Sequence, residues 1–282
     1  MSEEEFRLLR DLINGYCGIY FDDHLKYMLE RRLGRRVQQR MLRSFGEYEQ
    51  FLRFDPEREN ELGQVVELLT TNETYFFREK YQLDVFSRDV LPELVAHNRK
   101  RGDHTLQVWS AGCATGEEAY TLAIILSDFE KLRNWQWSIM ATDISIRALQ
   151  QARGGSYGPH SFREEMPMGS DRYFTRDGDG RKLVSEDLKR RVTFSALNLT
   201  DPMRHALFHG LDAIFCRNVL IYFDQATKRK VVDLFYRKLK PGGFLFLGHS
   251  ESLVNLSTSF ALRHFQGDMV YQKPVTGKGE EQ

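Results

Sequence analysis

The sequence has no net charge and few of the residues that mark specialised environments. Across 282 residues, 40 Lys and Arg residues balance 40 Asp and Glu residues, which excludes a broadly cationic nucleic-acid binder. The three cysteines are far apart, and neither a CxxC pair nor a histidine cluster offers metal ligands, so we expect a reducing compartment and no metal. No segment approaches the roughly 20 apolar residues of a membrane span, and the acidic, amphipathic N-terminus is unlike a signal peptide. These absences predict a cytoplasmic globular protein that does not insert into membranes.

Residues 1–80 are predicted to form a helical domain. Apolar residues recur there at three- and four-residue spacing, no strand-like alternation is present, and Pro56 is the only proline. Within one helix, apolar positions step by four and indicate a single buried stripe. A further helix is expected after this stretch, with Asn72 or Thr74 as its N-cap. The stripe consists of Leu25, Leu29, Leu33, Val37 and Met41.

Strands and helices alternate after residue 104, which indicates a parallel sheet with helices on both faces. Residues 157–198 interrupt this alternation with short strand-like pieces around an Asp-Gly turn, so we interpret them as a small antiparallel β-insertion. The expected parts of the chain are a helical domain at 1–80, a linker helix and loop at 81–103, a sheet domain at 104–273 and a flexible tail at 274–282.

The loops that follow strands are candidate ligand sites, because an open parallel sheet binds its ligand beyond the carboxyl ends of its strands. Small residues from Ser110 to Gly116 leave the backbone bare where the first strand meets a helix. Their spacing is not GxGxxG, which argues against a dinucleotide. Glu117 and Glu118 place carboxylates where a pyrophosphate would need positive charge. They favour a ligand that carries a cation, or else they only complement the helix dipole.

Two further loops carry polar side chains at the same edge. Asp143 ends the second strand, where a carboxylate commonly accepts hydrogen bonds from both hydroxyls of a ribose, although a helix N-cap explains it equally well. Arg217, Asn218 and Tyr222 lie at or just beyond a later buried strand, although a tyrosine among apolar residues is usually part of the core. Together these loops predict a nucleoside ligand with a positively charged, non-phosphate part, which S-adenosylmethionine fits.

Four ordered motifs resemble those of the chemotaxis-receptor glutamate methyltransferases of the CheR type, and the likeness extends to about Tyr271. The resemblance implies an α/β fold, with a class I S-adenosylmethionine-dependent methyltransferase (Rossmann-like) sheet and a small antiparallel β-insertion, preceded by an all-α N-terminal domain. It implies methyl transfer to glutamate side chains of chemoreceptors in chemotactic adaptation. The motifs are NETYFFRE at 72–79, WSAGCATGEEAYTLA at 109–123, ATDI at 141–144 and FCRNVLIYFD at 215–224, beside LKPGG at 239–243, which recurs in class I methyltransferases.

The resemblance also implies roles for individual residues. Arg78 and Tyr222 would lie nearest the transferred methyl group and act by orienting groups, since a carboxylate nucleophile is already ionised at neutral pH. Adjacent helical residues point about 100° apart, so only one of Glu117 and Glu118 is expected to face the cofactor. The implied cofactor-binding residues are Asn72, Thr74 and Arg78 from the domain junction, Glu118 at the methionine or adenosine part, Asp143 at the ribose, Asn198 and Leu199 at the adenine, and Arg217 with Asn218.

The implied partner is the acidic helical bundle of a membrane chemoreceptor, bound by a monomer. Seven basic residues and one acidic residue lie between His24 and Ser44, a local excess of six positive charges that would steer such a partner. A charge run of this kind is otherwise a solvated helix face. The short loop TRDGDGRK of the insertion argues against use of a receptor tether. The proposed docking residues are Arg31, Arg32, Arg35, Arg36, Arg40 and Arg43.

Other interpretations stay open at this point. A methyltransferase acting on nucleic acid would use the basic helix, but the neutral charge and the lack of an NPPY-like motif after the fourth strand argue against it. Enzymes acting on another protein or on a small molecule would share the cofactor loops, and a small-molecule enzyme would leave the basic helix unexplained. A non-catalytic scaffold is expected to lack Arg78 or Tyr222, and both are present.

Overall fold

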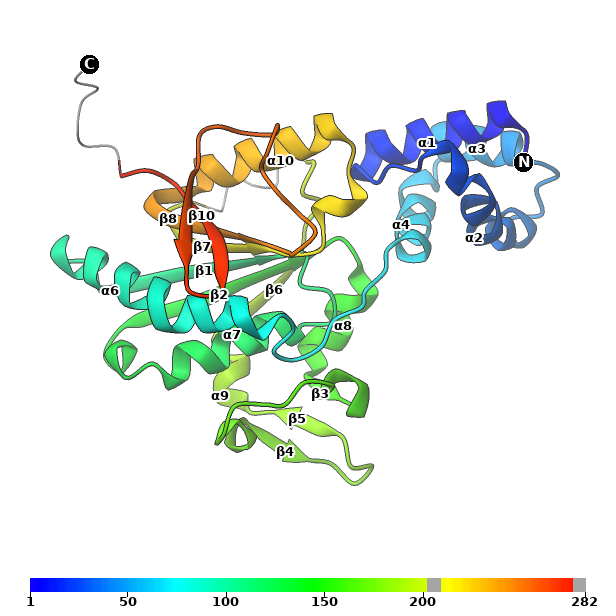
Figure 1. Ribbon diagram of the computed structural model, residues 1–282. Helices are drawn as coiled ribbons and strands as arrows, with labels where there is room; N and C mark the ends of the chain where they lie inside the picture. The colour runs from blue at the N-terminus through cyan, green and yellow to red at the C-terminus, as the bar shows by residue number, and fades with distance from the viewer. Residues whose placement is uncertain (202–208, 276–282) are drawn as a thin grey trace, which may run out of the picture.

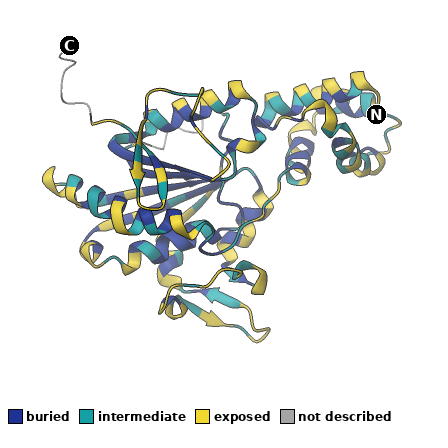
Figure 2. Ribbon diagram, in the orientation of Figure 1, coloured by how far each residue is buried: buried dark blue, intermediate teal, exposed yellow. Residues whose placement is uncertain are grey.

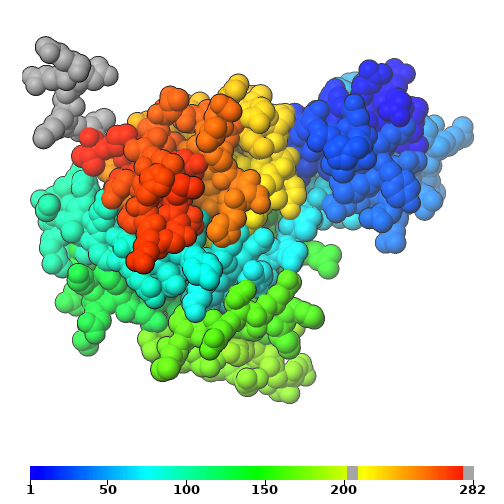
Figure 3. Space-filling model, viewed as in Figure 1, coloured from blue at the N-terminus to red at the C-terminus, as the bar shows by residue number. Residues whose placement is uncertain are grey.

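The structure, a computed structural model, describes residues 1–201 and 209–275 and consists of two domains (Figure 1). A helical N-terminal domain forms a lobe beside a larger sheet domain, as the space-filling view also shows (Figure 3). Most of the expected flexible tail lies outside the described residues. In the described part of the chain, none of the helices combines the length and the apolar character needed to cross a membrane.

Four helices pack around a hydrophobic core in the N-terminal domain. Leu29, Leu33 and Val37 are buried on one face of the second helix, as the stripe predicts. The prediction is wrong for Met41, because the helix ends at Gln39 and a left-handed φ of 54° turns Met41 outward, where it is 91% exposed. The helices are α1 (Glu3–Cys17), α2 (Lys26–Gln39), α3 (Phe45–Phe54) and α4 (Arg58–Leu69).

A buried carboxylate joins α2, α3 and α4. Glu61 is fully buried and accepts hydrogen bonds from Arg36 at 2.5 Å, Arg40 at 2.8 Å and the Tyr48 hydroxyl at 2.7 Å. Burial alone would raise the pKa of Glu61, but the hydrogen bonds from Arg36, Tyr48 and Arg40 outweigh it and lower the pKa to about 2. Two of the arginines predicted to dock a partner therefore satisfy a buried charge inside the domain.

The sheet domain contains a seven-stranded sheet in the order β6-β2-β1-β7-β8-β10-β9. The strands from β6 to β8 are parallel, as predicted, and β10 and β9 extend the β8 edge as an antiparallel hairpin. The sequence did not lead us to expect this hairpin. The strands are β1 (Thr105–Ala111), β2 (Gln136–Asp143), β6 (Val192–Ala196), β7 (Leu211–Cys216), β8 (Leu239–Leu247), β9 (Ala261–Phe265) and β10 (Asp268–Gln272).

The central strands are buried (Figure 2), and their alternate residues face two hydrophobic cores, as the period of two of a β-strand requires. On β7, Phe215 belongs to the core that includes α5, α6 and α7, whereas Ile214 belongs to the opposite core with α10. Helices thus cover both faces of the sheet, which confirms the α/β prediction. The helices are α5 (Lys80–Val85), α6 (Leu91–Lys100), α7 (Glu117–Asp128), α8 (Ile146–Gly154) and α10 (Gln225–Lys238).

Residues 81–103, expected as a linker helix and loop, contain helices that pack onto the sheet. Leu83, Val90 and Leu94 are buried in the same core as the sheet, because α5, a π-helical turn (Phe86–Val90) and α6 pack onto it. The domains are connected by residues 70–79, which we call the strap: 70–75 have no regular secondary structure, and 76–79 form turns. Neither Asn72 nor Thr74 caps a helix, since α5 begins only at Lys80.

The predicted antiparallel insertion is present but shorter than expected. Its sheet has the order β3-β5-β4 and is followed by the short helix α9 (Glu186–Lys189). The expected C-terminal part of the insertion is β6, which pairs in parallel with β2 and forms an edge of the main sheet. The insertion strands are β3 (Ser156–Tyr157), β4 (Phe174–Arg176) and β5 (Lys182–Val184).

Candidate active site

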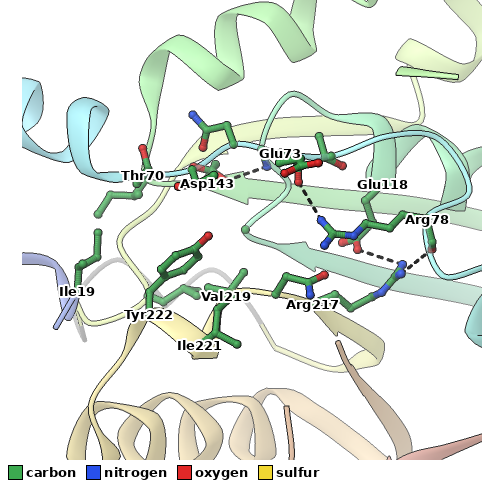
Figure 4. A pocket seen from close by; sticks show the side chains of 18 of the residues that line it. Ile19, Thr70, Glu73, Arg78, Glu118, Asp143, Arg217, Val219, Ile221 and Tyr222 are labelled. Carbon is green, nitrogen blue, oxygen red and sulfur yellow. Dashed lines mark hydrogen bonds and ion pairs between the residues drawn. The ribbon is translucent and has the colours of Figure 1, made fainter. Parts of the chain in front are cut away.

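The strand order changes direction at β1. From β1 the chain first adds β2 and β6 on one side of the sheet, and it later adds β7 and β8 on the other side. Such a switch point leaves a crevice beyond the carboxyl ends of the strands, where open α/β sheets bind ligands. Loops after β1, β2, β6 and β7 line one pocket there (Figure 4). The strap and the residues after α1 complete its wall, so the N-terminal domain takes part in the site.

All ten side chains predicted to bind the cofactor or to act in catalysis belong to residues that line this pocket. Glu118 is among them and Glu117 is not. Glu117 is 2% exposed and accepts hydrogen bonds from the hydroxyls of Thr115 and Ser161 on the insertion side. The ten residues are Asn72, Thr74, Arg78, Glu118, Asp143, Asn198, Leu199, Arg217, Asn218 and Tyr222.

The carboxylate of Asp143 is held by two backbone amides. Its Oδ2 accepts from the Ala114 amide at 2.8 Å and its Oδ1 from the Ser145 amide at 2.9 Å. Burial raises the pKa of Asp143 although these amides act in the opposite direction. The N-cap of α8 is Ser145, so the capping explanation for Asp143 does not apply. A carboxylate has about four lone-pair directions, so it can accept further hydrogen bonds beside those from these two amides.

Glu118 lies at the start of α7, between a hydroxyl and a guanidinium. Its Oε1 accepts from the Ser110 hydroxyl at 2.6 Å, and its Oε2 lies 3.4 Å from Arg217 Nη1. Burial raises the pKa of Glu118, and the charge of Arg217 opposes that rise. This arrangement presents a fixed, partly desolvated carboxyl group to the pocket, which suits a cationic ligand.

The strap is anchored by Phe76, which is fully buried against the insertion. Three aromatic rings of the insertion lie 4.8–5.3 Å from the Phe76 ring, centroid to centroid, and its amide donates to the Ser161 carbonyl at 2.8 Å. Long-range packing of this kind holds the strap in a non-helical conformation, which explains why no helix begins at residue 72. The insertion therefore positions a segment that lines the pocket.

Backbone geometry at the end of the strap fixes Arg78. Its neighbours Phe77 and Glu79 have left-handed φ values of 57° and 56°, a conformation that non-glycine residues rarely adopt. Arg217 Nη2 donates to the Arg78 carbonyl at 2.5 Å, and Arg78 Nη1 donates to the Glu73 carbonyl at 2.9 Å. Figure 4 shows the Arg78 guanidinium directed toward the carbonyl of Glu73 beside the pocket.

The loop after β7 brings Asn218 and Tyr222 into the pocket. Asn218 has a φ of 59°, and its buried Oδ1 has no hydrogen-bond partner among the described residues, so it can accept from a ligand. The Tyr20 amide donates to the Tyr222 carbonyl at 2.9 Å, and Ile19 forms an antiparallel bridge with Phe223. The N-terminal domain thus holds the backbone of Tyr222, whose hydroxyl points into the pocket (Figure 4).

Several residues that line the pocket were not predicted from the sequence. Cys17 and Ile19 reach the pocket from the N-terminal domain, and the Asn198 amide donates to the Tyr16 carbonyl at 2.6 Å, so it also joins the domains. These contacts connect segments far apart in the sequence, and no local pattern indicates them. Tyr75 of the strap also lines the pocket, next to the predicted Thr74.

The chemistry of the lining residues fits S-adenosylmethionine. Carboxylates of Asp143 and Glu118 suit the ribose hydroxyls and the positive charge, and the buried Oδ1 of Asn218 can accept from an amino group. A Cβ at Gly112 would lie 2.3 Å from Val219 Cγ2, so the loop approaches closely only because this residue is glycine. Among the described residues, no group of three or more His, Cys, Asp or Glu side chains can hold a metal ion.

The predicted docking arginines, which lie on α2 and in the turn after it, fall into two groups. Arg32 donates to the carbonyls of Leu68 and Leu69 at the end of α4, and Arg36 and Arg40 pair with Glu61. These three side chains hold the domain together. The remaining three are exposed, namely Arg31, Arg35 and Arg43.

A Rossmann-like sheet with this pocket at its switch point is the fold of a class I methyltransferase. The family model described as the CheR methyltransferase SAM binding domain matches residues 72–267, and that of the CheR methyltransferase all-alpha domain matches residues 4–70. The chain belongs to the CheR methyltransferase family, which confirms the resemblance inferred from the motifs.

Several characterised relatives align with nearly the whole chain. Chemotaxis protein methyltransferase 2 of Vibrio cholerae is 36% identical over 100% of this chain and 96% of its own length. Chemotaxis protein methyltransferase 1 of Pseudomonas aeruginosa is 37% identical over 96% of this chain and 98% of its own. The chemotaxis protein methyltransferase of Escherichia coli is 36% identical over 96% of this chain and 91% of its own.

Proposed function

We propose that the protein transfers a methyl group from S-adenosylmethionine to the side-chain carboxylate of specific glutamates of chemoreceptors, giving glutamate methyl esters and S-adenosylhomocysteine. Its relatives named as chemotaxis protein methyltransferases support this function, which belongs to sensory adaptation. The observation that carries the proposal is the composition of the pocket wall. Among the residues that the structure describes, no histidine or lysine lines it, and burial raises the pKa of the lining Cys17 thiol to about 12.

A wall of this kind suits a nucleophile that needs no general base. A glutamate side chain has a reference pKa of about 4.3 and is ionised at neutral pH. Hydroxyl and amine substrates, in contrast, must lose a proton during methylation. Each of the three carboxylates that line the pocket has partners: backbone amides for Asp143, Ser110 and Arg217 for Glu118, and Arg163 for Glu73. The site therefore favours a carboxylate substrate over a small-molecule amine, an alcohol or a nucleic-acid base.

The work of the protein is then alignment and exclusion of water. S-adenosylmethionine supplies an electrophilic methyl group on a sulfonium, and the transfer cancels its positive charge against the carboxylate. Asp143, Glu118 and Asn218 would hold the cofactor, and Arg78 and Tyr222 would orient the substrate carboxylate. Alignment of two reactants at about 3 to 3.5 Å can supply several kcal/mol of the barrier. Removal of water from around the carboxylate strengthens the electrostatic interactions in the pocket.

We further infer that the enzyme is a cytoplasmic monomer that uses no metal and recognises the helical bundle of the receptor. Docking is expected through the exposed arginines of α2 and of the turn after it, which complement acidic receptor helices. Nucleic acid is not expected as a partner, because the chain as a whole is neutral.

Charge reversal at Arg31, Arg35 and Arg43 to glutamate is expected to lower receptor methylation about tenfold or more at low salt. The variant should bind S-adenosylhomocysteine normally, because these side chains lie outside the pocket. Reversal of Arg36 or Arg40 is unsuitable, since it would leave Glu61 facing like charges.

The matched control reverses Arg99, Lys100 and Arg101, three exposed cations at the end of α6, and changes the net charge equally. Initial methylation rates of receptor-containing membranes, measured at low and high salt, report the effect. Equal rates for the α2 variant and the control would contradict docking through α2.

A further inference from the structure

The turn that follows β8 inserts a carboxylate beneath the loop after β7. Glu251 Oε2 accepts from the amides of Gly248 at 2.7 Å and Asn218 at 2.8 Å. Its Oε1 accepts from the amides of Val219 at 3.0 Å and Ile221 at 3.2 Å. One side chain therefore satisfies four backbone donors, three of them in the loop that lines the pocket.

That loop needs external support, because it has little regular structure of its own. Asn218 is left-handed, with a φ of 59°, and only a single 3₁₀ turn, Leu220–Tyr222, follows it. Arg217, Asn218 and Tyr222 all line the pocket, whereas Glu251 does not. The carboxylate thus lies behind the loop, on the side away from the ligand.

The fit between the two segments is close. A Cβ at Gly248 would lie 2.9 Å from both the backbone nitrogen and the side-chain Nδ2 of Asn218, so only glycine permits this approach. The four acceptor directions of a carboxylate match the four amides in number, whereas a glutamine side chain has a single acceptor oxygen with two directions. Burial raises the pKa of Glu251, while the amides of Gly248 and Asn218 act in the opposite direction.

We propose that Glu251 is a positioning residue, which fixes the backbone from Asn218 to Ile221 so that Arg217, Asn218 and Tyr222 are preorganised for the cofactor. It acts through the loop and touches neither cofactor nor substrate. The inference rests on the proposed function only in that the pocket binds S-adenosylmethionine, and it does not depend on the receptor.

The test compares Glu251→Gln with Asp212→Asn. Asp212, at the opposite end of β7, is 1% exposed and also accepts several hydrogen bonds. Its donors are the side-chain amide of Asn98, the backbone amide of Gln107 and the ammonium group of Lys240. Hydrogen exchange of the free protein should speed up in residues 217–222 for Glu251→Gln only. Calorimetry with S-adenosylhomocysteine should show a roughly tenfold weaker Kd for Glu251→Gln and an unchanged Kd for Asp212→Asn.

Rescue by Glu251→Asp distinguishes positioning from general stability. Aspartate keeps the four acceptor directions on a shorter side chain, so Glu251→Asp should bind more tightly and exchange more slowly than Glu251→Gln. If Glu251→Gln does not fold, Glu251→Asp is compared with the wild type instead, and it should show partial losses of both affinity and protection. The proposal would be overturned by an unchanged affinity in Glu251→Gln or by an equal loss of affinity in Asp212→Asn. It would also be overturned if Glu251→Asp exchanged normally but did not bind S-adenosylhomocysteine. Wild-type protein that binds S-adenosylhomocysteine but leaves receptors unmethylated would contradict only the proposed substrate.

Discussion

Replacement of Asp143 by asparagine is expected to weaken the affinity for S-adenosylhomocysteine about 100-fold. An asparagine offers one acceptor oxygen and turns its NH₂ group toward the amide of Ala114 or Ser145, which now donate to the carboxylate at 2.8 and 2.9 Å. The change removes one charge-assisted hydrogen bond to the ribose and disturbs the loop. Hydrogen bonds to charged groups contribute about 1.5–3 kcal/mol each, which corresponds to one to two orders of magnitude.

Glu117→Gln is the control for this variant. Glu117 is also a buried carboxyl group beside the same loop, and burial raises its pKa as it does that of Asp143. It does not line the pocket, so its replacement should leave the Kd within about twofold of wild type. Calorimetric titration with S-adenosylhomocysteine measures both variants. An Asp143→Asn protein that is folded and binds like Glu117→Gln would show that Asp143 does not hold the ribose.

Arg78→Ala and Tyr222→Phe are expected to lower kcat while the protein stays folded. We expect a loss of about 100-fold for Arg78→Ala, because the alanine removes both the charge and the groups that orient the substrate carboxylate. Loss of the Tyr222 hydroxyl alone should cost about tenfold, the effect of roughly one hydrogen bond. Single-turnover methylation with saturating cofactor measures the transfer step itself.

Arg163→Ala is the control for Arg78→Ala. Both guanidinium groups lie over the Tyr75 ring, at 5.3 Å for Arg163 and 5.8 Å for Arg78, but only Arg78 lines the pocket. The Arg163 variant should keep the transfer rate of the wild type to within about threefold. Full activity of both Arg78→Ala and Tyr222→Phe would exclude the catalytic roles assigned to them.

Periodicity and loop position predicted most of the sheet domain and the location of the pocket. The alternation of strands and helices predicted the parallel sheet. The rule that such sheets bind ligands beyond the carboxyl ends of their strands pointed to Glu118, Asp143 and Arg217, which all line the pocket. The same rule applied to GHSES after β8 would have pointed to Glu251. The individual contacts to the cofactor stay predictions, because the pocket geometry supports them without testing them.

What the sequence could not indicate depends on contacts between distant segments. The strap looked helical, but packing of Phe76 against the insertion holds it in a non-helical conformation. Arg36 and Arg40 looked like free cations, because the carboxylate of Glu61 that they pair with lies more than 20 residues away in the sequence. Local pattern cannot distinguish a solvated arginine from one that satisfies a buried charge on another helix.

The central claim is that the pocket transfers a methyl group to a carboxylate of a receptor. The most direct test incubates the protein with methyl-labelled S-adenosylmethionine and membranes that contain candidate chemoreceptors. We predict label in the receptor that mild base releases as methanol, as a glutamate methyl ester requires. With Asp143→Asn, this label should fall strongly when the cofactor concentration is below saturation. Label in nucleic acid, or a base-stable adduct on the receptor, would contradict the account.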